Sequence, residues 1–101
     1  MLTAQEAKER SERAIHIKKN MEFDKGITFI EKRIEDAISQ GKYKCVASVK
    51  ITDDLYTDDE KILFHEKIKQ AIASYGYKII SEGGSRGSDN TFFYDYVITW
   101  R

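Results

Sequence analysis

The longest regular pattern of apolar and polar positions covers Thr57–Gly76 and predicts an amphipathic helix. Apolar side chains recur there at intervals of three and four residues, which places them on one helical face. This stripe comprises Phe64, Ile68, Ala71, Ile72 and Tyr75. Thr57 and Glu60 have the spacing of a capping box, and Gly76 suits the left-handed conformation that ends a helix. We expect the first two members of the stripe to be fully buried between this helix and a sheet.

The first forty residues also favour helix, but their apolar positions change face part-way. The first set comprises Ala7, Ala14, Ile17 and Met21. The second set comprises Phe23, Ile27, Ile30, Ile34, Ala37 and Ile38, and it lies about half a turn away at roughly 100° per residue. Either the chain breaks near Asp24–Gly26 into two helices, or one helix of about 55 Å runs through and projects from the domain. Both geometries are open at this point, and we favour the projecting helix.

A projecting helix with an exposed apolar stripe favours a partner, and a second copy of the chain is the simplest one. We therefore expect a homo-oligomer, in the simplest case a dimer, with Ala14, Ile17 and Met21 in the interface. Phe29 lies off the second stripe and is a further candidate for this contact. In the alternative helix hairpin, the two stripes cover each other within one chain.

Three segments alternate between apolar and polar residues and predict strands, at residues 43–51, at Tyr77–Glu82 and at Thr91–Trp100. The order predicts an α+β fold, in which a long N-terminal helix or helix pair precedes a β-α-β-β unit. A strand–helix–strand crossover places its two strands parallel, so we expect a three-stranded mixed sheet with the helices on one face. We divide the chain into a helical arm, 1–40, and a β-α-β-β domain, 41–101, within one compact domain overall.

The sheet face away from the helices is a candidate contact surface. Phe93 and Val97 put apolar side chains there, on the opposite side of the last strand from Tyr94 and Tyr96. Aromatic side chains on a sheet can stack nucleic-acid bases, but that use requires a basic surround. The chain has 17 Lys and Arg against 17 Asp and Glu, so we do not expect it to bind nucleic acid.

The connection Gly83–Asn90 is the candidate anion-binding loop. Its central residues are Gly84, Ser85, Arg86, Gly87 and Ser88. Glycines expose backbone N–H groups, and Arg86 can hold a phosphate through two hydrogen bonds. The loop lacks the ending of a P-loop, and a flexible hairpin tip explains the same composition. A nucleotide or another phosphate-bearing signal is thus the ligand of an alternative function, as a small-ligand binding or sequestering protein.

The remaining residue types give no sign of catalysis. Cys45 is the only cysteine, so it forms no internal disulfide, and neither His16 nor His65 has a neighbour at metal-ligand spacing. No nucleophile–base pair is visible either. We therefore expect no catalytic residues, no metal and no cofactor. The absence of a long apolar run favours a soluble, intracellular protein without membrane contact.

Four stretches carry a resemblance to a class of proteins. They are Thr3-Ala4-Gln5-Glu6-Ala7-Lys8, Ala37-Ile38-Ser39-Gln40-Gly41-Lys42-Tyr43, Gly76-Tyr77-Lys78-Ile79 and Ile98-Thr99-Trp100. Over most of its length the chain resembles small proteins encoded by tailed bacteriophages and prophages. The resemblance assigns no functional residue. It implies a viral protein in the cytoplasm of a bacterial host, where it binds a host protein for host takeover or counter-defence.

Overall fold

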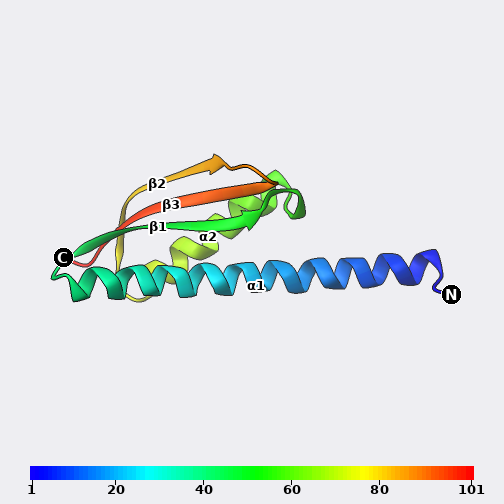
Figure 1. Ribbon diagram of the computed structural model, residues 1–101, viewed down its shortest axis with the longest axis horizontal. Helices are drawn as coiled ribbons and strands as arrows, with labels where there is room; N and C mark the ends of the chain where they lie inside the picture. The colour runs from blue at the N-terminus through cyan, green and yellow to red at the C-terminus, as the bar shows by residue number, and fades with distance from the viewer.

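A computed structural model describes residues 1–101 and shows a long helix, a shorter helix and a three-stranded sheet (Figure 1). The elements are α1 (Ala4–Ser39), β1 (Lys44–Thr52), the short 3₁₀ helix η1 (Asp53–Leu55), α2 (Asp58–Ser74), β2 (Lys78–Arg86) and β3 (Thr91–Thr99). This order confirms the predicted α+β class. Neither α-helix combines the length and the apolar character needed to cross a bilayer.

Residues 4–39 form one unbroken helix, so the projecting helix is correct and the helix pair is wrong. The Thr3 hydroxyl accepts a hydrogen bond from the Glu6 N–H at 3.1 Å and caps the first turn. Gly41, with φ of 73°, adopts the left-handed conformation just beyond the last turn. The molecule measures 59 Å along its longest axis but only 22 and 21 Å across it, because the N-terminal half of α1 extends past the sheet (Figure 1).

The core lies between the second half of α1, α2 and one face of the sheet. The buried helical side chains are Ile30, Ile34, Ala37, Phe64, Ile68 and Ile72, which confirms the predicted burial of the α2 stripe at its first two positions. Ile38 is exposed instead, because it is rotated by about 100° from Ala37 and thus leaves the sheet-facing side. Since Phe23 and Ile27 also pack on the core, the segment predicted as an arm is free only over its first half.

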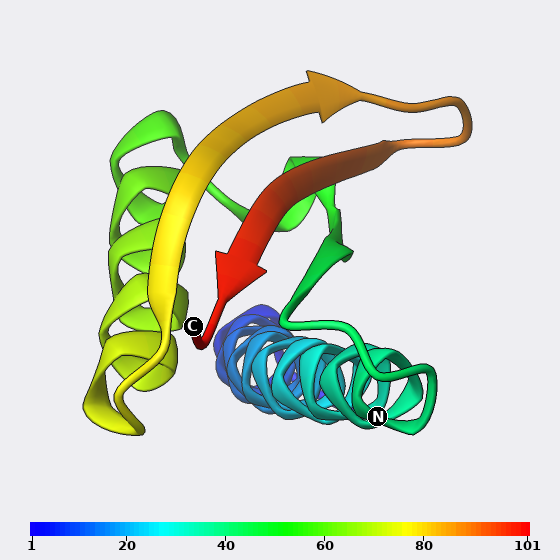
Figure 2. The same cartoon turned by 90° about the vertical axis from the view of Figure 1, so that its left-hand side faces the viewer.

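The strand order is β1-β3-β2 and every neighbouring pair is antiparallel, so the predicted mixed sheet is wrong. The crossover through α2 does make β1 and β2 run in the same direction. However, β3 returns between them and pairs with both, which leaves no parallel neighbours. Figure 2, a view along α1, shows α2 beside β2 and α1 closer to β1.

The hairpin between β2 and β3 is shorter than predicted. β2 continues to Arg86, so only residues 87–90 connect the strands, and the expected eight-residue loop is wrong. Asp89 and Asn90 turn the chain with φ of 57° and 59°. The Asn90 carbonyl accepts from the Asp53 N–H at 2.9 Å, which ties the turn to η1.

α1 approaches β1 closely at Gly26, which is buried within the helix. A Cβ atom at this position would lie 2.7 Å from Val49 Cγ1 and 3.7 Å from Ile68 Cδ1. The missing side chain therefore lets the helix backbone rest directly on β1. Glycine costs about 1 kcal/mol relative to alanine inside a helix, and here the close contact outweighs that cost.

We expect Gly26→Ala to lower the free energy of unfolding by up to about 2 kcal/mol. Overpacking a core costs about 1–3 kcal/mol, whereas improved helix propensity returns only about 1 kcal/mol. Urea denaturation measures the difference. Thr28→Ala, on the exposed side of the same turn, is the matched control and should not destabilise. A more stable Gly26→Ala protein would contradict the close packing against Val49.

Candidate functional site

The N-terminal half of α1 is a free arm. Every residue from 1 to 18 is exposed. Lys19 ties the end of this exposed stretch to α2, because its Nζ lies 2.5 Å from Glu60 Oε2. Figure 1 shows this part of the helix extending beyond the sheet into open space. The arm is therefore available to another molecule.

The apolar residues of the arm face away from the domain. We call Ala7, Ala14, Ile17 and Met21 the arm stripe. The side chains of Ile17 and Met21 are 58% and 51% exposed, and both alanines are exposed as well. At about 100° per residue the stripe lies roughly opposite the α1 face that packs on the sheet. The structure thus brings together three of the four predicted interface residues: Ala14, Ile17 and Met21.

Phe29, the fourth predicted interface residue, lies elsewhere. It is 43% exposed and borders a hollow beside Ser48 and Lys50 of β1. On the helix it is rotated by roughly 80° from Met21, so one flat partner surface does not cover both side chains. Phe29 thus lies on the α1–β1 side, and its part in the arm contact stays a prediction.

Glu22 fixes the point at which α1 leaves the domain. Its carboxylate accepts hydrogen bonds from the Thr52 N–H at 3.1 Å, the Thr52 hydroxyl at 2.7 Å and the Tyr56 hydroxyl at 2.9 Å. Burial and the hydrogen bond to Glu22 raise the pKa of the Tyr56 hydroxyl. No sequence pattern marked Glu22, because its partners are more than 25 residues away along the chain.

Half of the predicted anion-binding loop is strand and not loop. Gly84, Ser85 and Arg86 belong to β2, and only Gly87 and Ser88 lie in the turn. A Cβ atom at Gly84 would lie 3.1 Å from the Phe92 ring, and one at Gly87 would lie 2.5 Å from Phe93 Cε2. These glycines therefore make room for aromatic rings of β3. No observation favours the nucleotide-binding alternative.

Phe93 and Val97 lie on the sheet face away from the helices, where the sequence places them. Both are half-buried. Val97 pairs across the sheet with Val46 of β1, and on the same face the Ser48 hydroxyl donates to Asp95 Oδ1 at 2.6 Å. This face of the sheet thus combines apolar side chains with polar side chains that are hydrogen-bonded to each other.

His65 belongs to a polar cluster that fastens α2 to the sheet. Its Nδ1 lies 2.8 Å from the Tyr96 hydroxyl and its Nε2 lies 3.3 Å from Glu82 Oε1. Hydrogen bonds from His65 and Lys69 lower the pKa of Glu82. Tyr96 is completely buried, and burial raises the pKa of its hydroxyl. These hydrogen bonds join α2 to β2 and β3.

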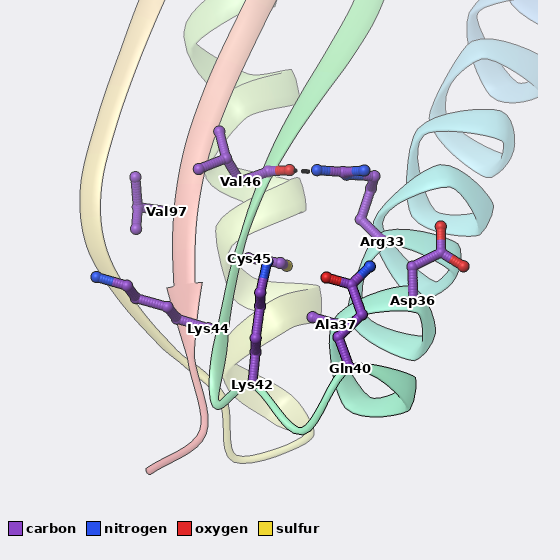
Figure 3. A pocket seen from close by; sticks show the side chains of 9 residues that line it. All are labelled: Arg33, Asp36, Ala37, Gln40, Lys42, Lys44, Cys45, Val46 and Val97. Carbon is purple, nitrogen blue, oxygen red and sulfur yellow. Dashed lines mark hydrogen bonds between the residues drawn. The ribbon is translucent and has the colours of Figure 1, made fainter.

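A groove separates α1 from the outer edge of β1. Figure 3 shows its end near the C-terminus of α1, a hollow of about 530 Å³. Arg33 reaches across it and donates from Nε to the Val46 carbonyl at 3.0 Å. Lys42 and Lys44 border the same hollow from the strand side. The sequence pattern did not indicate this groove.

No known family model, curated protein sequence or solved structure matches the chain. Function is accordingly argued from the arm and the surfaces of the domain.

We expect Arg86→Ala to change the free energy of unfolding by less than about 0.5 kcal/mol. The guanidinium is 75% exposed and lies 3.9 Å from Asp53 Oδ2, and such ion pairs contribute little. Lys61→Ala is the control, because Lys61 pairs with the same carboxylate from a mostly buried position. In urea denaturation, Lys61→Ala should lower the free energy of unfolding by more than Arg86→Ala does. Equal losses would show that Arg86 has a structural role.

We expect the protein to lose stability above pH 10, and we expect Tyr94→Phe to weaken this dependence. Burial raises the pKa of Tyr94 to about 12, whereas an unfolded tyrosine titrates near about 10. Stability is therefore complete below about pH 10 and falls towards about pH 12, by up to about 1.4 kcal/mol per pH unit for each such tyrosine. Urea denaturation at several alkaline pH values measures the slope. An unchanged slope in Tyr94→Phe would contradict this assignment.

Proposed function

We propose that this protein is a non-catalytic interaction protein that self-associates through the arm stripe and binds a second protein. The observation that carries the proposal is the free arm itself. Ile17 and Met21 remain more than half exposed, and every residue from 1 to 18 is exposed. Exposed apolar stripes of this kind mark interaction sites.

Helix energetics support a partner for the arm. In proteins most of the stability of a helix comes from packing its apolar face and not from intrinsic propensity. The arm has a capped first turn and many charged residues, but it buries nothing within its own chain. Pairing two arm stripes would cover the apolar side chains, and a two-fold axis allows the same surface to serve both copies. A homodimer is the simplest assembly with this property.

The second partner is proposed on different grounds. The resemblance to small proteins of tailed bacteriophages and prophages supports a bacterial host protein, bound in the host cytoplasm during takeover or counter-defence.

Light scattering coupled to size-exclusion chromatography tests self-association. At tens of micromolar the protein should elute with twice the monomer mass. Ile17→Glu combined with Met21→Glu should yield a folded monomer, because two carboxylates would face each other across the paired stripes. Circular dichroism verifies that the variant is folded.

Ile62→Glu combined with Ile80→Glu is the matched control. These side chains are 62% and 59% exposed on α2 and β2, so they resemble Ile17 and Met21 in exposure but lie outside the arm. This variant should remain dimeric. A monomeric wild-type protein, or a control variant that dissociates as readily as the arm variant, would overturn the proposal.

A further inference from the structure

β1 has one edge without a neighbouring strand, because the sheet order is β1-β3-β2. Backbone groups of odd-numbered residues point to β3: the Tyr43 carbonyl accepts from Trp100, and the Asp53 N–H donates to Asn90. Even-numbered residues point the other way, since the Val46 carbonyl and the Thr52 N–H bond to side chains of α1. The free edge therefore carries the backbone groups of the even-numbered residues.

Side chains of α1 bond to two backbone groups of this edge. Arg33 occupies the Val46 carbonyl at 3.0 Å, and Glu22 accepts from the Thr52 N–H at 3.1 Å. Between them, Ser48 and Lys50 each present an N–H and a carbonyl to the edge, and no side chain of α1 bonds to them. These four groups are what an extended peptide needs in order to add a strand.

The open part of the edge lies in a groove. Two hollows of about 530 and 500 Å³ follow each other along β1, and α1 forms the facing wall. Phe29 borders the groove as a half-exposed apolar surface next to Ser48. The groove therefore offers open backbone groups of β1 on one side and an apolar side chain of α1 on the other.

The charge of the groove selects the peptide. Its cations are Lys25, Arg33, Lys42, Lys44 and Lys50. None of them forms an ion pair within the protein, whereas Glu22, one of the two acidic residues there, is already hydrogen-bonded to Thr52 and Tyr56. A chain with zero net charge thus concentrates unpaired positive charge along one sheet edge.

We propose that the free edge of β1 binds an extended, acidic segment of a partner protein as an additional strand. The segment pairs its backbone with Ser48 and Lys50, places an apolar side chain against Phe29, and directs carboxylates to the flanking lysines. This inference deepens the proposed function and rests on it for the existence of a protein partner. The groove itself is separate from the arm stripe.

Fluorescence anisotropy with a labelled peptide of alternating glutamate and valine tests the site. The peptide should bind, and methylation of alternate backbone nitrogens should weaken binding at least tenfold by removing strand hydrogen bonds. Lys25→Glu combined with Lys50→Glu should also weaken binding at least tenfold. Lys8→Glu combined with Lys78→Glu changes the net charge equally, outside the groove, and should leave affinity within about twofold.

The same titration on the Ile17→Glu, Met21→Glu protein separates the two proposals. Unchanged affinity there supports a groove that acts independently of self-association, whether or not the wild-type protein is a dimer. Equal binding of the methylated peptide or of a lysine–valine peptide would overturn the inference. Tighter binding of a single-stranded oligonucleotide than of the acidic peptide would also overturn it. If the Lys25→Glu, Lys50→Glu variant lost its dimer, the occupant of the groove would be a second copy of the chain, and the inference would be overturned as well.

Discussion

The structure is governed by a mismatch in length between its longest helix and its sheet. β1 has nine residues and spans roughly 30 Å, whereas the 36 residues of α1 span roughly 54 Å. The sheet can therefore cover little more than half of α1. The rest extends into solvent, and the packing at Gly26 together with the hydrogen bonds of Glu22 decides which half that is. The free arm is thus a direct result of how the core is built.

The arm could be predicted from the sequence because helical periodicity reports which side of a helix is buried. The apolar face changes between Met21 and Phe23, and Glu22 marks the same boundary in the structure. The pairing of the strands was harder to predict, since alternation identifies the buried face of a strand but not the strands beside it. β3 shows the expected faces, yet its position between β1 and β2 depends on long-range pairing that no local pattern encodes.

The candidate sites show the same division. Exposed Ile17 and Met21 were visible from spacing alone. Gly84 and Gly87 were misread, because the role of a glycine depends on what lies beside it, here the rings of Phe92 and Phe93. The groove at β1 was missed for a different reason: its binding groups are backbone N–H and carbonyl groups, which every residue possesses. Only the tertiary arrangement determines which of them remain unpaired.

The central position of the last strand has a consequence for how the protein is made. Ribosomes release α1, β1, α2 and β2 before β3, and neither β1 nor β2 has another strand beside it until β3 arrives. The sheet therefore closes in a late step that depends on distant segments of the chain, and such non-local pairing is slow. The arm of α1 precedes all of these segments in the chain. The surface proposed for self-association is therefore synthesised before the strand that completes the sheet.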